Sequence, residues 1–249
     1  FTVTYEEGRE LIAVAAEADR LLSVFQNRRW DGDFLTVRKL IDEGRLGRIV
    51  SFESRFDRIR PQPKPGAWRE GSEPGSGILF DLGPHLVDQA LLLFGEPDRV
   101  RGDVRRERDS GEADDAFDLV MRYEKLRVTL GAGMLVRDRT PRFVIRGTAG
   151  AFVKYGLDPQ ESALGSGAVP GGEGWGLESP EAWGSLIDDG GSSRIETLPG
   201  NYPAFYENIR DAITTGAPLA VTAAEALAAI RVLELALADS RGEPLPALR

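Results

Sequence analysis

Five short stretches between residues 99 and 155 place the strongest constraint on how this chain folds. Each has the length of a β-strand and is rich in β-forming residues, and only short turns separate one from the next. Strands joined by short turns pair antiparallel, so the stretches predict an antiparallel sheet. They cover residues 99–106, 116–123, 126–135, 142–145 and 151–155.

A further strand and four helices are predicted around this sheet. The run GRIVSFESRFDRIRP alternates in the two-residue period of a half-buried strand and ends near Pro61. Helical spacing of apolar residues predicts helices in YEEGRELIAVAAEA, DFLTVRKLIDEG, YPAFYENIRDAITTG and TAAEALAAIRVLELALADS. Capping-box spacing marks the start of two of them, at Thr4 with Glu7 and at Thr222 with Glu225. The order predicts an α+β fold: an open, predominantly antiparallel sheet covered by helices on one face.

The first thirty residues suggest a different kind of structure. After the first helix, residues 20–26 (RLLSVFQ) form a short apolar run of strand length. A helix followed by a buried strand is typical of parallel α/β sheets. Because one such pair cannot form a sheet, and because the sequence starts at Phe1 rather than methionine, we expect the partner strands to precede it.

Composition argues against several classes of function. The chain has no cysteine and a single histidine, which excludes disulfides, thiolate chemistry and histidine-rich metal sites, so we expect no metal. Acidic residues outnumber basic ones by 40 to 31, and this excess makes nucleic acid an unfavourable partner. No apolar run approaches the roughly 20 residues that cross a bilayer, and no signal-peptide pattern is present. We therefore expect a cytoplasmic protein without a membrane partner.

Residues 156–193 are rich in glycine, serine and proline, which is compatible with a disordered loop. Trp175 and Trp183 favour an ordered arm, because large aromatic side chains usually pack against a surface.

The stretch GSGILFDLGPHLVDQALLLFG contains the only histidine, His85. Pro84 suits the first turn of a helix that ends at Gly95. In a first turn the positive helix end would keep the imidazole neutral, and Asp81 lies close enough in sequence to orient it, so the pair could form a general base. A surface cap with a neighbouring histidine is the simpler interpretation of these two residues alone.

This stretch resembles a segment of the glucose–fructose oxidoreductase and inositol dehydrogenase (Gfo/Idh/MocA) superfamily, in which an aspartate, three residues, a histidine and an apolar helix follow small residues. The first 34 residues are similar to the end of that family's nucleotide-binding domain, and GAPLAVTAAEALAAIRVLELALADS to its closing helices. NRRWDGDFLTVRKLI, YGLDPQESAL and WGLESPEAWGSL are similar to the branch that contains the NADP-dependent scyllo-inositol dehydrogenase. The resemblance extends from Phe1 to about Ser240.

The resemblance implies an NAD(P)-dependent dehydrogenase that transfers hydride between nicotinamide and a secondary alcohol of a cyclic polyol or sugar. It implies that residues 1–30 are the end of a Rossmann nucleotide-binding domain and residues 31–249 a substrate-binding and dimerisation domain. The family's glycine-rich phosphate loop and its Glu-Lys-Pro sequence are absent, so we expect the chain to be inactive alone. A non-catalytic sugar-binding or assembly module that kept the fold is the alternative.

The resemblance also implies roles for individual residues. His85 would be the catalytic base and Asp81 its orienting partner. Contacts with cofactor are implied for Asn27, Arg28, Trp68 and Arg69, and contacts with substrate for Asp57, Asn27 and His85. From the residues alone, a tryptophan beside an arginine is more often loop packing, and Asp57 could equally pair with Arg58 or Arg60.

Association through the open sheet face is also expected. In the stretch FDLVMRY, Phe117, Leu119 and Met121 lie on one side and Asp118, Val120 and Arg122 on the other. A half-apolar second face would suit a homodimer or a dimer of dimers, and the alternative is a monomer whose second face is solvated.

Overall fold

The computed structural model describes residues 1–244, which divide into two compact units. The first unit contains Phe1–Val24, Glu53–Thr140 and the chain from Thr222 onward, and the second contains Phe25–Phe52 and Pro141–Val221. The expected boundary at residue 30, between the end of a nucleotide-binding domain and the domain that follows it, stays a prediction. Residues 245–249 of the expected 31–249 domain lie outside the described residues.

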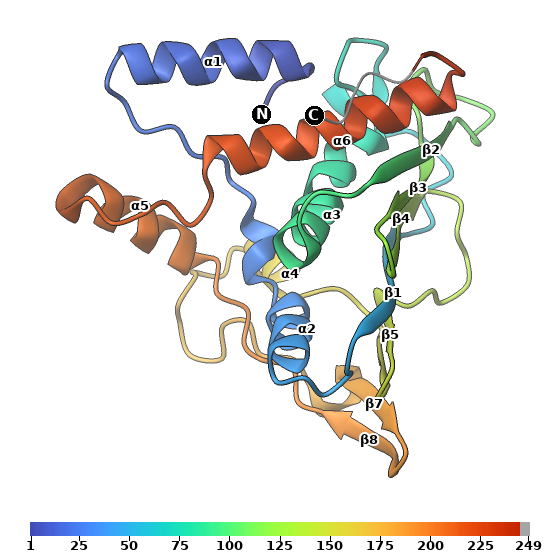
Figure 1. The fold of residues 1–249 in the computed structure, drawn as a ribbon. Helices are drawn as coiled ribbons and strands as arrows, with labels where there is room; N and C mark the ends of the chain where they lie inside the picture. The colour runs from blue at the N-terminus through green and yellow to red at the C-terminus, as the bar shows by residue number, and fades with distance from the viewer. Residues whose placement is uncertain (245–249) are drawn as a thin grey trace. The chain divides into compact units, whose positions relative to one another are not determined.

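The first unit packs two helices against antiparallel strands. Its strand order is β2-β3-β4-β1, with β2–β3 and β3–β4 antiparallel, and β1 contributes residues 53–57 here and residues 49–52 to the second unit. Helices α3 and α6 contact each other and these strands, and α1 packs on α6 (Figure 1). The elements are α1 (Tyr5–Glu17), β1 (Ile49–Asp57), η2 (Trp68–Glu70), α3 (Ile78–Phe94), β2 (Arg99–Arg105), β3 (Ala116–Arg122), β4 (Arg127–Gly133) and α6 (Ala223–Ser240).

Alternating apolar side chains of β3 contribute to the core of the first unit. Phe117, Leu119 and Met121 are fully buried, whereas Asp118 and Val120 between them remain partly exposed. The alternation expected for FDLVMRY is thus confirmed, and burial of these apolar side chains stabilises the unit.

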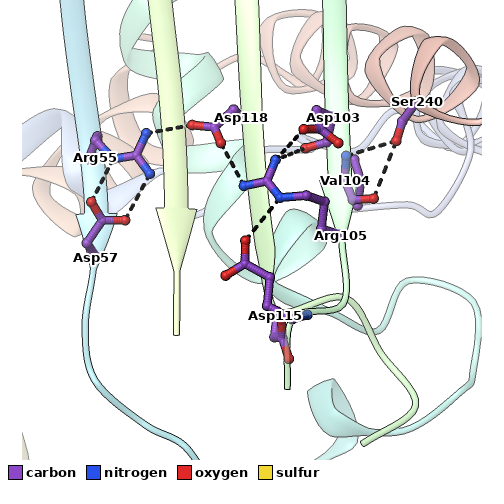
Figure 2. Close-up of polar contacts among 9 residues, drawn as sticks. Arg55, Asp57, Asp103, Val104, Arg105, Asp115, Asp118 and Ser240 are labelled. Carbon is purple, nitrogen blue, oxygen red and sulfur yellow. Dashed lines mark hydrogen bonds and ion pairs between the residues drawn. The ribbon is translucent and has the colours of Figure 1, made fainter. Parts of the chain in front are cut away.

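The partly exposed side of these strands carries a network of ion pairs (Figure 2). Asp118 on β3 accepts hydrogen bonds from Arg55 on β1 at 2.6 Å and from Arg105 on β2 at 2.8 Å. Arg55 reaches Asp118 across β4 at Gly131, where an added Cβ would overlap both the guanidinium and the carboxylate. A glycine at this position is therefore what lets the ion pair cross the strand.

The second unit has the strand order β1-β5-β6-β7-β8, and the three pairs from β5 to β8 are antiparallel. The expected arm at residues 156–193 is ordered: it contains a short helix and most of the β7–β8 hairpin, and the Trp175 indole donates to Gln160 Oε1 at 2.8 Å. The elements are η1 (Asn27–Trp30), α2 (Gly32–Asp42), β5 (Phe143–Gly147), β6 (Ala151–Lys154), α4 (Gln160–Gly165), η3 (Pro180–Ala182), β7 (Gly184–Asp188), β8 (Gly191–Ile195) and α5 (Pro203–Thr215).

The structure confirms the predicted fold class and both capping boxes, with an open and mostly antiparallel arrangement of strands. Residues 20–26 form no strand within residues 1–244. Because their partner strands are expected to precede the sequence, the buried strand there stays a prediction. Helix α5 belongs to the second unit, where it contacts η1. Within residues 1–244, no helix combines the length and the apolar character that a membrane span requires.

Candidate active site

Helix α3 carries Asp81 and His85 of the stretch GSGILFDLGPHLVDQALLLFG. An aspartate distant in sequence caps the first turn of this helix. Asp114 Oδ2 accepts a hydrogen bond from the backbone N–H of Leu79 at 2.8 Å, and the Asp114 carbonyl accepts one from Ile78 at 3.0 Å. Gly77, the residue before the helix, has φ +93°, and an added Cβ would overlap the Asp114 carboxylate. Burial raises the pKa of Asp114 to about 6.

The start of α3 differs from the prediction, and the difference changes the electrostatic argument for His85. The helix begins at Ile78, so Pro84 lies inside it and His85 is its eighth residue. The helix dipole acts within the first turn, where Asp81 lies instead. The expectation that the helix end keeps the imidazole neutral is therefore wrong. The prediction failed because Pro84 looked like a helix start, whereas the cap comes from a distant loop.

Arg69, which is expected to contact the cofactor, forms an ion pair with Asp81, the expected orienting partner of the catalytic base. Its Nη1 donates to Asp81 Oδ2 at 2.9 Å and to Oδ1 at 3.1 Å. The Arg69 guanidinium carbon also lies 5.8 Å from the centre of the Trp68 ring, and Trp68 is 61% exposed. His85 follows Asp81 by four residues in a helix, which places the two on the same face. The first unit thus places Arg69 against Asp81 in the first turn of α3, with Trp68 next to Arg69 and His85 one turn further along the helix.

Asp57 has a different partner from those that the sequence suggested. Arg55 donates to both of its carboxylate oxygens, at 2.6 Å and 3.2 Å, and the Asp57 side chain is almost fully buried. Since both oxygens are engaged within the ion-pair network (Figure 2), this geometry gives no support to a contact between Asp57 and substrate.

Asn27 and Arg28 lie in the second unit, in the 3₁₀ turn η1. The Asn27 amide donates to Glu161 Oε1 at 3.2 Å. Arg28 Nη1 donates to Asp31 Oδ2 at 3.2 Å, and its Nη2 lies 3.7 Å from Glu161. Glu161 of α4 thus contacts both residues, and Asp31, the residue before α2, also contacts Arg28.

A buried cluster of charges surrounds Arg28 in the second unit. The Tyr202 hydroxyl donates to Asp31 Oδ1 at 2.8 Å, and Asp158 accepts from the Gly32 N–H at 2.6 Å. Asp33 is fully buried, and both its oxygens lack a hydrogen-bond partner within residues 1–244, although Arg142 Nε lies 3.7 Å away. Burial raises the pKa of Asp31 to about 8, and the negative charge of Asp33 adds to the rise. Burial also disfavours the charged guanidinium of Arg142, and this lowers the pKa of Arg142 to about 10.

Sequence reasoning missed the residues that support these side chains. Asp114 caps α3 from the loop between β2 and β3, and Tyr202 and Glu161 reach Arg28 from α5 and α4. For Asp114 the sequence signal was its place beside Asp115, just before a predicted strand. No spacing rule links Asp114 to Leu79 of α3, which lies 35 residues earlier. No group of three or more acidic, histidine or cysteine side chains in the described chain is arranged to hold a metal ion.

Comparisons with known proteins agree on one family. A model described as the C-terminal alpha/beta domain of an oxidoreductase family matches residues 38–245. The uncharacterized oxidoreductase YdgJ of Escherichia coli is 43% identical over 97% of this chain and 70% of its own length. The scyllo-inositol 2-dehydrogenase (NADP(+)) IolW of Bacillus subtilis is 42% identical over 96% of this chain and 68% of its own. A solved structure of YPO2259 from Yersinia pestis superimposes with a TM-score of 0.92 and 42% identity, over the whole chain and 71% of that structure.

Proposed function

Because the chain belongs to the Gfo/Idh/MocA family of oxidoreductases, we propose that it is the substrate-binding and dimerisation portion of an NAD(P)-dependent dehydrogenase. The substrate class is a cyclic polyol or sugar, oxidised at a secondary alcohol. The relative named as a scyllo-inositol 2-dehydrogenase, 42% identical to this chain, supports that class.

One observation of the structure carries the proposal. Asp81 and His85, the only histidine, share one face of α3, and Arg69 holds the carboxylate of Asp81 with a single guanidinium nitrogen. A general base needs a group that accepts a proton near neutral pH and a partner that fixes its orientation. The imidazole of His85 and the carboxylate of Asp81 provide this pair.

The chain's own residues would handle the proton of the reaction. His85 would accept the proton of the substrate hydroxyl during oxidation and return it during reduction. Asp81 would hold the imidazole and stabilise its protonated form, as a carboxylate does beside a histidine base. Asn27 would donate its amide to a substrate hydroxyl or to the cofactor carboxamide, and Arg28 would contact the cofactor.

The residues present fit the nicotinamide end of a cofactor. Trp68 offers an exposed flat ring, and the adjacent Arg69 offers a guanidinium suited to carboxamide or phosphate oxygens. No glycine-rich loop stands between a strand and a helix in the sequence, so the chain's own residues provide no cradle for the phosphates. A bound nicotinamide would exchange hydride with the alcohol carbon.

An assay of the complete gene product tests the proposal. The protein is incubated with NADP⁺ or NAD⁺ and a cyclic polyol such as scyllo-inositol, and the absorbance of reduced nicotinamide is followed. We expect reduction of the cofactor with the cyclic polyol and slower reduction with an open-chain hexitol. Saturable binding of the polyol without any cofactor reduction would instead support a non-catalytic sugar-binding module.

We also propose that two copies associate through the sheet face that carries the ion-pair network. Every arginine drawn in that network already faces a carboxylate of its own copy, so the second copy would not have to supply partners for these arginines (Figure 2). A symmetric pair of such faces could bury roughly 1,000 Å² or more, the size of a stable interface.

The mass in solution tests this association. Sedimentation at micromolar protein concentration is expected to give a dimer or a dimer of dimers, and the assembly is expected to persist at high salt, because ion pairs formed within each copy do not hold the copies together. A monomer mass at both salt concentrations would rule the interface out.

A further inference from the structure

Arg108 is a buried cation outside the groups with a proposed role in the reaction. It lies in the loop between β2 and β3, and its side chain is 2% exposed. Nη1 donates to Glu70 Oε2 at 2.7 Å, and Nε lies 3.7 Å from Asp115 Oδ2. A buried guanidinium carries a large desolvation cost, so its carboxylate partners are essential to it.

The loop that presents Arg108 is itself rigidly held. The Asp115 carboxylate accepts hydrogen bonds from the backbone N–H groups of Glu107 at 2.7 Å and of Arg108 at 3.1 Å, and the Asp115 N–H donates to the Arg105 carbonyl at 3.0 Å. Arg108 is therefore fixed to the end of β2 and the start of β3, which belong to the core of the first unit.

Glu70 links Arg108 to Arg69, the residue before it in the chain. The two residues are consecutive in the turn η2, and they bind in different directions: Glu70 to Arg108, and Arg69 to Asp81 on α3. The rest of the segment is held at its ends, where Ser76 Oγ donates to the Trp68 carbonyl and Gly77 N–H to the Arg69 carbonyl. A turn attached at two points cannot rotate about either one, so the Glu70–Arg108 pair limits where the Arg69 guanidinium can lie.

We infer that Arg108 is a positioning residue, which places Arg69 against Asp81 through Glu70. This inference rests on the proposed function of Asp81 and His85. A small cavity of about 10 Å³ is lined by six charged residues, Arg69, Glu70, Asp81, Arg108, Asp114 and Asp115, so their side chains lie close to one another. Displacing one of them changes the field at the others.

Four variants test the inference: Arg108→Met, Glu70→Gln, the two combined, and Arg108→Lys. Arg108→Met leaves the largely buried Glu70 carboxylate without its cation partner and should lower the melting temperature. The double variant removes the charge of that carboxylate and should recover most of the lost melting temperature. His85 is the only histidine, so its imidazole NMR signals are assigned without ambiguity and report the environment of α3 in the chain itself.

If Arg108 positions Arg69, the His85 signals of the double variant should still differ from those of wild type. Its turnover should be about 10- to 100-fold lower at nearly unchanged KM, because a small misplacement near the reacting groups has such effects. Arg108→Lys, which can still reach Glu70, should restore both. If the double variant recovers the wild-type signals and turnover along with its stability, Arg108 serves stability only and the inference is wrong. If Arg108→Met does not fold, a further variant, Glu70→Ala, breaks the same link, because alanine offers Arg108 no acceptor.

The NMR measurement also separates this inference from the proposed function. Displaced His85 signals in the double variant would support the link from Arg108 to α3 even if the enzyme assay detects no dehydrogenase activity. Unchanged signals with a working dehydrogenase would overturn the link and leave the function standing.

Discussion

Replacement of His85 by alanine in the complete gene product is expected to lower turnover by about 10²- to 10⁴-fold, the usual effect of removing an acid–base group. Cofactor affinity should stay nearly unchanged, because the side chains proposed to contact the cofactor are others. Alanine is favourable inside a helix, so α3 should form as before. Steady-state kinetics at saturating substrate, with cofactor binding measured by calorimetry, give the two quantities.

A second substitution at the same position sharpens the test. His85→Gln can still donate and accept hydrogen bonds but cannot take up a proton near neutral pH, so it should be as impaired as alanine if His85 is the base. Recovery of near-normal turnover in His85→Gln would show that the residue only orients the substrate. Near-full activity in both variants would remove His85 from the mechanism.

Stability is expected to fall with rising pH through the carboxyl group of Asp31. Burial raises the pKa of this group to about 8 in the folded protein, against about 4 in an unfolded chain. Below pH 4 the carboxyl is protonated in both states. Between about pH 4 and pH 8 only the folded state holds the proton, so unfolding releases one proton and each rise of one pH unit lowers stability by up to about 1.4 kcal/mol.

Asp31→Asn isolates this contribution from those of other carboxylates. Asparagine resembles the neutral acid and can still accept the hydrogen bond from Tyr202. The variant should therefore gain stability relative to wild type as pH rises from 5 to 8, by several degrees in melting temperature, since about 1 kcal/mol corresponds to roughly 2–4 °C in a protein of this size.

The matched control for this prediction is Asp42→Asn, the same substitution at an exposed position of the same helix, α2. Its melting temperature should differ from that of wild type by a constant amount across the pH range. If the Asp31→Asn curve also runs parallel to wild type, Asp31 is ionised in the folded state and the neighbouring guanidinium groups of Arg28 and Arg142 outweigh its burial.

Local signals in the sequence are enough to predict several elements. The two-residue period of FDLVMRY predicts which side of β3 is buried, because side chains of a strand alternate between faces. Capping boxes at Thr4 and Thr222 predict two helix starts, because each needs only residues three positions apart. The placement of Asp81 and His85 on one face of α3 likewise depends on spacing within a single helix.

Contacts between distant groups depend on the tertiary structure. Asp114 caps α3 at a start six residues before Pro84, and neither the Arg69–Asp81 pair nor the Arg108–Glu70 pair follows a sequence period. Residues 20–26 have the length and the apolar character of a strand, but a strand needs a partner, and no strand within residues 1–244 pairs with them. Charge pairing and helix capping each satisfy an individual polar group, so any element that the fold brings close to that group can supply the partner.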